Sequence, residues 1–527
     1  MDEPTSPDIP GKLYQDEQTA KTPLQESTEE FLPNRTIWDD SNDGSGALGL
    51  KVEDVLPGTF NPRNHWYERS LNAQIHPLVR YFCSLSTEQV VSRYCHMNPK
   101  TEPEALLKWL QYPPKAFAWS GADLFHVTSA QGKRQMVVIE VNSSPSGQKS
   151  MPPLYDDEEQ GGYRRLIERT FLPRISQKRR LPAGGLAVIY DKNYMEASGY
   201  AAAMADLTGE IVHLVPAFKN SYHHFMRFSD RTLEIYSMTQ NAWLPIRGAF
   251  RYVTQQPWTR IPVNTRSFIL NPIIACLAGG RNKLVASKAY DFFNAELIPK
   301  GLRIQTPYTI WDVHQEEVPL WVHRLGGKAV VKVPYSNAGQ GVFTIMNDQE
   351  LNRFSETEFR YKSFIVQSLI GNYGWSSRGH EGLLYHIGTV PSVQCCTYVA
   401  DVRMMIHHSQ DGWKPLALYA RRAQMPLAQK LDPDTDSWSM LGTNLSIKQE
   451  DGGWTTDTSR LLMFDRKDFN QLGLGIDDLI EGFVQTVLST IAIDLMADKL
   501  TTEKGTLKQS LFRSINNDPA LHKEIEL

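Results

Sequence analysis

A short apolar strand that ends in a lysine and runs directly into a loop of small residues constrains the fold most strongly. Residues 330–341 read VVKVPYSNAGQG, and a second apolar run, VFTI, follows them. Backbone N–H groups can approach a polyphosphate where side chains are small, and Lys332 would neutralise its charge. The loop lacks the G-K-[ST] ending and the following helix of a Walker P-loop. The segment therefore predicts either a polyphosphate site on antiparallel strands or a plain hairpin turn beside a surface lysine.

An Asp-x-Arg pair on a predicted strand is the second feature. Asp401 and Arg403 alternate along an apolar run, so both side chains would lie on one face of a strand. Arg421 and Arg422 lie on the next predicted strand, LYARRA. An arginine that an aspartate orients can bind a phosphate or a carboxylate with two parallel hydrogen bonds. A cross-strand ion pair without a ligand is the competing interpretation.

Oxygen-bearing side chains also end a third apolar strand. Residues 135–142, QMVVIEVN, place Glu140 and Asn142 on one face. A polar turn separates this strand from another at residues 116–128, which carries Asp123, so an antiparallel pair is predicted. Carboxylate and amide oxygens suit Mg²⁺. The alternative is a solvent-exposed carboxylate beside an asparagine that starts a turn.

Charge is unevenly distributed along the 527 residues. The formal net charge is −4, but residues 1–50 contain eleven acidic and three basic side chains, a net charge of −8, which leaves +4 for the remainder. This acidic segment is rich in Pro, Ser and Thr without apolar periodicity, and we expect it to be disordered. The small net charge gives no support for nucleic acid or an anionic membrane as a partner. Five cysteines without C-x-x-C spacing argue against a disulfide framework or a Cys-rich zinc site.

The remaining patterns predict a mixed α+β and α/β chain. Residues 64–110 and the C-terminal residues show helical spacing, whereas buried strand runs and helices alternate after residue 185, as in a small doubly wound unit. No signal peptide and no run of eighteen apolar residues is visible, so we expect a cytoplasmic protein without a membrane span. We predict five parts: a disordered acidic leader (1–57), helices with metal-binding strands (58–184), an α/β substrate domain (185–275), the lysine-loop and Asp-x-Arg subdomains (276–460), and a helical segment (461–527).

Together, these motifs resemble the ATP-grasp superfamily. The lysine with its Gly-rich loop, the strand V-Q-x-L-I at 366–370, the Asp-x-Arg strand, T-N-x-S at 443–446 and E-x-N at 140–142 carry the resemblance, which covers roughly residues 116–450. E-x-N usually comes last in such chains, but here it precedes Lys332. This order resembles the circularly permuted branch that eukaryotic glutathione synthetase typifies. The resemblance implies two antiparallel sheet subdomains that hold ATP, and a small α/β substrate domain.

The resemblance also implies a role for each matched residue. Asp123, Glu140 and Asn142 would hold Mg²⁺, and Lys283 and Lys332 would contact the ATP phosphates. Ser336, Asn337, Ala338, Gly339, Gln340 and Gly341 would cover the phosphates, and Gln367, Ser368, Leu369 and Ile370 would border adenine. Arg403 and Arg422 would stabilise the transferring phosphoryl group, and Arg247, Arg251, Ser143 and Ser144 would bind the substrate.

The resulting hypothesis is an ATP- and Mg²⁺-dependent ligase that joins a small-molecule carboxylate to an amine or thiol through an acylphosphate. We expect no nucleic-acid or membrane partner, and a homodimer is an open alternative. The substrates would be amino acids or small peptides. A small-molecule kinase with the same ATP site is the first alternative. The second is a non-catalytic binding protein, because Asn337 stands where glutathione synthetases carry a metal-binding glutamate. An oxidoreductase is least supported, since residues 186–200 lack G-x-G-x-x-G.

Overall fold

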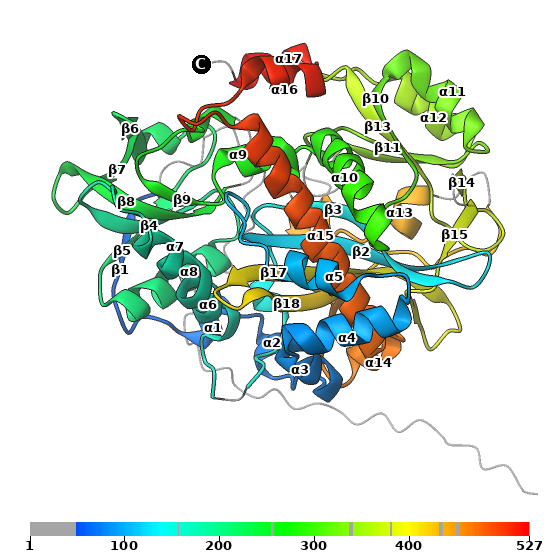
Figure 1. Ribbon diagram of the computed structural model, residues 1–527, viewed down its shortest axis with the longest axis horizontal. Helices are drawn as coiled ribbons and strands as arrows, with labels where there is room; N and C mark the ends of the chain where they lie inside the picture. Colours follow the sequence, from blue (N-terminus) through cyan, green and yellow to red (C-terminus); the bar gives the residue numbers. More distant parts are fainter. Residues whose placement is uncertain are drawn as a thin grey trace, which may run out of the picture. The chain divides into compact units, whose positions relative to one another are not determined.

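The computed structural model describes residues 49–155, 157–253, 258–336, 341–379, 382–431, 436–448 and 454–525 (Figure 1). Contacts divide the chain into Met1–Thr36 and Ile37–Leu527, and every described residue lies in the second unit. Most of the predicted leader, residues 1–48, therefore lies outside the described residues.

An eight-stranded antiparallel sheet carries the Asp-x-Arg and E-x-N motifs. The strand order is β14-β15-β2-β17-β18-β21, with β3 paired to β2 and β16 paired to β17. The predicted antiparallel pairing of β2 with β3 is confirmed. The bounds are β2 Trp119–Ser129, β3 Arg134–Asn142, β14 Arg378–Gly379, β15 Gly382–His386, β16 Thr389–Pro391, β17 Thr397–Ser409, β18 Gly412–Arg422 and β21 Leu461–Met463.

The register of this sheet brings distant motif residues together. Asp123 of β2 lies opposite both Glu140 of β3 and Arg403 of β17, and Asp401 lies opposite Arg421 of β18. A register shift follows Asp123, because its neighbour Leu124 pairs with Val138 rather than with residue 139. Such a bulge redirects the side chains beside it. One face of the sheet therefore collects carboxylates and arginines from four strands.

A four-stranded antiparallel sheet carries the lysine strand. Its order is β10-β13-β11-β12, and Lys332 ends β11. Helices α11 (Val318–Arg324) and α12 (Asp348–Glu356) cover an apolar core of its own, which contains Val331, Phe354 and Val366. The bounds are β10 Thr309–His314, β11 Ala329–Lys332, β12 Val342–Ile345 and β13 Ser363–Ser368.

The third large sheet has seven strands and a parallel centre. Strands β5, β4, β8 and β9 run parallel, whereas β7 with β6, and β1 at the other edge, are antiparallel. Helix α8 (Tyr194–Thr208) connects β4 to β5, which is the crossover that parallel strands require. The bounds are β1 Glu53–Val55, β4 Gly185–Tyr190, β5 Val212–Pro216, β6 Met226–Ser229, β7 Thr232–Ser237, β8 Ala242–Tyr252 and β9 Phe268–Leu270.

Strand β1 corrects the predicted end of the leader. We expected disorder through residue 57, but Glu53–Val55 pairs with β5. Two side-chain contacts fix this edge strand: Tyr194 donates to Glu53 at 2.6 Å, and His213 lies 2.7 Å from Asp54. The acidic residues here thus have partners in the α/β sheet, which composition alone does not reveal.

Helix α15 (Ile476–Leu500) runs through the core and packs against β3, β17, α4 (Thr87–Met97) and α10 (Lys283–Leu297). It is long and apolar enough to cross a membrane, but 89% of its most apolar window is buried inside this fold. Its buried Asp494 accepts backbone N–H groups of Lys115, Ala116 and Phe117 at 2.7–2.9 Å, just before β2. The long helix therefore supports the strands and the helix that carry the predicted site.

The predicted N- and C-terminal helices are confirmed, and the mixed α+β fold with several antiparallel sheets is as expected. The remaining short elements are α1 Pro62–His65, α2 Glu68–Leu71, α3 Pro77–Ser84, α5 Pro103–Leu110, α6 Gly161–Leu166, α7 Leu172–Ser176, α9 Ile273–Ala275, α13 Ser437–Leu441, α14 Asp468–Gln471, α16 Gln509–Ile515, α17 Pro519–Ile525, β19 Ser446–Lys448 and β20 Trp454–Thr456.

Candidate active site

Two adjoining hollows lie between the eight-stranded and four-stranded sheets. They share Glu140, Lys283, Lys332 and Gln367 in their walls, so they form one continuous site. The hollows have volumes of about 40 and 120 Å³. Sites for drug-sized ligands usually have roughly 300–1,000 Å³. A nucleoside triphosphate therefore requires the two sheets to move apart.

The first part of the site is apolar and suits a nucleobase. The predicted hinge residues Gln367, Ser368, Leu369 and Ile370 all line it. Gln367 is oriented by donating from Nε2 to the Thr309 hydroxyl at 2.9 Å. Phe125, Trp438 and Leu441 add apolar surface, and Thr443 and Asn444 of the T-N-x-S motif also lie in this wall.

His386 is a residue of this wall that the sequence did not single out for nucleotide binding. It is 8% exposed, and burial lowers its pKa to about 4, so the imidazole is neutral. Its ring bonds to the backbone of Ile370, and its Nδ1 has no hydrogen-bond partner in the described structure. A neutral ring nitrogen without a proton accepts hydrogen bonds. His386 thus offers a nucleobase an acceptor at the hinge.

Two lysines form the second part of the site, where the sequence predicted phosphate binding. Lys332 is 6% exposed, and burial lowers its pKa to about 8, although Glu140 opposes that shift. Lys283, at the start of α10, donates to the Ser336 carbonyl at 2.6 Å and lies 3.5 Å from a Glu140 oxygen. Both amines therefore lie in the hollow beside a single carboxylate. Their combined positive charge exceeds the charge of that carboxylate, which favours a polyanionic ligand.

Only the ends of the small-residue loop are described. Gly341 has φ +69°, a conformation that glycine adopts without strain, and its carbonyl accepts the Val333 N–H at 2.7 Å. Ser336 lines the hollow at the other end. The predicted phosphate-covering residues Asn337, Ala338, Gly339 and Gln340 lie outside the described residues.

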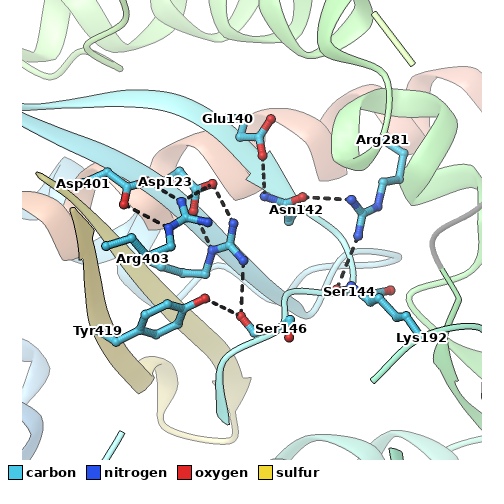
Figure 2. Close-up of polar contacts among 11 residues, drawn as sticks. Asp123, Glu140, Asn142, Ser144, Ser146, Lys192, Arg281, Asp401, Arg403 and Tyr419 are labelled. Atoms are coloured by element: carbon cyan, nitrogen blue, oxygen red, sulfur yellow. Dashed lines mark hydrogen bonds and ion pairs between the residues drawn. The ribbon is translucent and has the colours of Figure 1, made fainter. Parts of the chain in front are cut away.

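A network of arginines and carboxylates borders the site (Figure 2). Arg403 donates to both oxygens of Asp123 at 2.6 Å, and Arg421 contacts Asp123 at 2.9 Å and also pairs with Asp401. Burial alone would raise the pKa of Asp123, but the two guanidinium groups hold it below its ordinary value. Asp123 thus remains ionised and fixes both arginines, whereas burial raises the pKa of Asp401.

Arg421, not Arg422, lies in this network, which corrects the sequence hypothesis. Residues directly opposite each other in a sheet present their side chains to the same face, and Arg421 lies opposite Asp401. Its neighbour Arg422 therefore points to the other face, where it lies 4.8 Å above the Tyr398 ring. Successive residues of a strand point to opposite faces, so the identity of the residue opposite Asp401 distinguishes Arg421 from Arg422.

The predicted magnesium ligands fit a metal ion only in part. Glu140 accepts from the Asn142 amide at 3.1 Å, and both residues line the hollow. Asp123 already uses both oxygens for arginines. Among the described residues, no group of three or more His, Cys, Asp and Glu side chains is suited to a metal. Mg²⁺ is typically held by one or two carboxylates plus substrate phosphates and water. Glu140 therefore fits an ion that arrives with a nucleotide, and Asp123 does not. Asn142 would contribute its amide oxygen only beside the hydrogen bond that this oxygen accepts from Arg281.

A second group of cations surrounds the loop after β3, where the α/β sheet meets the other two (Figure 2). Lys192, just after β4, donates to the Ser144 carbonyl at 2.9 Å, and Arg281 donates to Asn142 at 2.9 Å and to the same carbonyl at 3.4 Å. Arg403 and Tyr419 both donate to the Ser146 carbonyl, at 3.3 and 2.8 Å. Burial lowers the pKa of Lys192 well below its ordinary value, and Arg281 adds to this effect. An anionic substrate group placed here would relieve that accumulation of positive charge.

Sequence reasoning missed Lys192 and Arg281. Lys192 follows the carboxyl end of a parallel strand, the position where open α/β sheets bind ligands, so its place in the chain was a usable signal. Arg281 precedes α10 in a Gly-Gly-Arg-Asn segment, and only the tertiary fold brings it to Asn142. Convergence from three sheets is not visible in local patterns.

Most of the predicted substrate residues are buried and have a structural role. Arg251 is 1% exposed and binds the backbone of Asn271 and Ser143, and Ser143 and Ser144 are themselves fully buried. These three residues anchor the loop after β3, whose Ser144 carbonyl accepts a hydrogen bond from Lys192. The structure does not bring Arg247 to the site, because it forms a 2.6 Å ion pair with Glu210 and binds the Gly184 carbonyl near the opposite end of β4.

Comparison with known proteins yields similarity to solved structures only. No protein-family model matches the chain. No curated protein matches it either. Three solved structures of ATP-grasp type match: a RimK domain ATP-grasp protein from Sphaerobacter thermophilus (13% identity, 57% of this chain and 98% of that one, TM-score 0.31), a glutathione synthetase-like effector from Globodera pallida (10%, 71% and 88%, 0.35), and D-alanyl-alanine synthetase A from Vibrio cholerae (12%, 50% and 93%, 0.28). Because the identities and TM-scores are low, we argue the function from the residues of this chain.

Proposed function

We propose that the protein is an ATP-dependent ligase that joins a small carboxylate to an amine or a thiol. The observation that carries this proposal is the presence of two adjacent cation groups on either side of Glu140 and Asn142. Lys283 and Lys332 lie on the nucleotide side. Arg281 also lines that hollow, beside Asn142, and contacts the Ser144 carbonyl that Lys192 binds from beyond the end of β4 in the α/β sheet. One group suits a triphosphate and the other suits a carboxylate, so the two reactants would meet between them.

The reaction would proceed in two steps. A carboxylate oxygen attacks the γ-phosphorus, and the bond between the γ-phosphorus and the β-phosphate oxygen breaks. ADP departs, and the substrate is now an acylphosphate. The amine nitrogen then attacks the carbonyl carbon, the bond to the phosphate oxygen breaks, and the amine proton passes to solvent as phosphate departs. Such chemistry depends on positioning, which is worth about 7–11 kcal/mol in favourable cases.

The chain's own residues would supply the positioning and the charge. Lys283 and Lys332 would bind the phosphates, and Arg421, which Asp123 and Asp401 hold in the wall of the site, would face the transferring group. Lys192 and Arg281 would bind the substrate carboxylate. A magnesium ion on Glu140 and Asn142 would neutralise phosphate oxygens when bound.

The order of the motifs supports the circularly permuted arrangement. Glu140 on β3 precedes Lys332 on β11 in the chain. This order resembles that of eukaryotic glutathione synthetase, so we expect amino acids or small peptides as substrates. We keep the expectations of a cytoplasmic location and of small-molecule partners without nucleic acid or membrane, and a homodimer stays an open alternative.

The test is ADP release against a panel of amino acids and short peptides, in pairs, with the mass of each product. A ligase gives a product lighter by one water than its two substrates combined. Addition of a stable phosphate to one substrate would instead establish a kinase, and absence of ADP with every pair would support a non-catalytic binding protein. Lys332→Ala should abolish release, whereas Lys328→Ala, at the other end of the same strand and outside both hollows, should not.

A further inference from the structure

A separate cavity of about 420 Å³ lies at the opposite end of β2 and β3 from the candidate active site. Its wall includes the hairpin residues Ser129, Lys133 and Arg134, together with Glu481 of α15, and it shares no residue with the two hollows described above. From Asp123 to Ser129 the strand spans roughly 20 Å at about 3.4 Å per residue. The cavity is therefore a distinct place for a ligand, with a volume in the range of small-molecule sites.

Glu481 gives this cavity an uncompensated carboxylate. Its described partners are neutral amides: Gln485 donates to Oε1 at 3.2 Å, and Asn98 forms a second side-chain hydrogen bond. Among the residues that the structure describes, it forms no ion pair within 4.0 Å. Burial raises its pKa to about 7. Glu481 is half-buried, so its carboxylate is only partly hydrated, and an ammonium group would offset that lost hydration.

Cations stand at the exposed rim of the same cavity. Lys133 and Arg303 both line it and both are exposed, and the charge of Lys133 acts on Glu481. Arg134 also lines it and pairs with Asp478 at 3.0 Å, so Lys133 is the rim cation whose charge acts on Glu481. Negative charge at the base and positive charge at the rim would match a ligand that carries both signs a few bonds apart.

We propose that this cavity binds a free α-amino acid as a zwitterion, with its ammonium group on Glu481 and its carboxylate toward Lys133. The opposed charges select against simple amines and simple carboxylic acids, each of which satisfies only one end. The site is independent of ATP and of the proposed ligase activity, because none of its residues lines the nucleotide hollows.

Titration calorimetry of the full chain without nucleotide tests this proposal. The probes are the free amino acids, each compared with its N-acetyl and amide derivatives. We expect saturable binding of at least one free amino acid and none of its derivatives. Glu481→Gln and Lys133→Ala should each weaken this binding about tenfold or more, the loss of one charge-assisted contact. Lys178→Ala, an exposed lysine outside the cavity, is the matched control.

Binding at the active site must be separated from binding at the cavity. Lys192→Met removes a cation of the candidate active site and should leave binding at the cavity unchanged. If no free amino acid binds, if the derivatives bind equally well, or if Lys192→Met alone abolishes binding, the proposal is wrong. Failure of the ligase assay would have no effect on any of these outcomes.

Discussion

Lys332 shows how one buried amine links phosphate binding to pH. Burial lowers its pKa to about 8, so the charged form that attracts a polyanion is present below that pH and is lost above it. We expect the affinity for ATP to fall as the pH rises from about 7 to about 9, by at most about tenfold per pH unit for one proton. Calorimetric titration of ATP across this range is the measurement.

Lys332→Arg is the control for that titration. Arginine stays protonated at every accessible pH. The affinity of the Lys332→Arg variant for ATP should therefore not decline above pH 8, whatever the absolute value of that affinity. An identical decline in both proteins would assign the pH dependence to another group.

Asp123 compensates two buried arginines, and this predicts a large effect on stability. Asp123→Asn leaves Arg403 without a counter-charge, and breaking a buried pair from one side typically costs about 3–5 kcal/mol. Urea unfolding should show this loss. Asp477→Asn, which breaks an exposed pair with Arg93, is the matched control and should change stability far less. Equal effects would mean that the Asp123 network contributes no more than a surface pair.

At the scale of elements, the loop after β3 is held by close backbone packing at Gly147. This glycine has φ +139°, and a Cβ there would lie 2.0 Å from the Tyr419 ring. Gly147→Ala should therefore displace the segment that Lys192, Arg403 and Tyr419 bind. We expect weaker substrate binding, seen as a raised KM for the carboxylate, with little change in the affinity for ATP.

Gly132→Ala separates backbone strain from this clash. Gly132 also has a positive φ, +79°, but nothing lies within 4 Å of an added Cβ. Gly132→Ala should therefore leave the KM for the carboxylate unchanged. If the two variants behave alike, the close contact with Tyr419 has no functional role.

The two sheets around the nucleotide hollow must separate to admit ATP, because the enclosed volumes are small. Hydrogen exchange of the backbone amides therefore tests the site at the level of elements. With ATP and Mg²⁺, exchange should slow in β11, β12 and α13, which border the hollow, and not in β6 and β7 of the α/β sheet. Protection confined to the α/β sheet would place the nucleotide elsewhere.

The elements were largely predictable, but their convergence was not. The apolar runs of β2 and β3 are separated by a polar turn, so their antiparallel pairing could be inferred, whereas the pairing of β2 with the distant β17 could not. The choice between Arg421 and Arg422 needed the register, and the position of Arg281 needed the packing of α10 against α15. Local sequence constrains an element's type, whereas contacts between distant segments depend on the whole fold.

At the scale of the whole molecule, three sheets each supply one part of the site. The eight-stranded sheet carries Glu140 and Arg403, and the four-stranded sheet carries Lys332. Lys192 lies just after the end of β4 in the α/β sheet. Helix α15 packs against both β3 and α10, so it supports Glu140 and Lys283 together. The site is therefore a property of the assembled chain, which is why its motifs lie about 190 residues apart, at Glu140 and Lys332.

Trapping of the acylphosphate tests the central claim most directly. Hydroxylamine can replace the unknown amine, so incubation with Mg²⁺, ATP and a panel of carboxylic acids should yield a hydroxamate and an equal amount of ADP. The wild-type chain and Lys328→Ala should form it, and Lys332→Ala should not. Hydroxamate formation at the same rate in Lys332→Ala, or none in the wild type with any acid of the panel, would contradict the account.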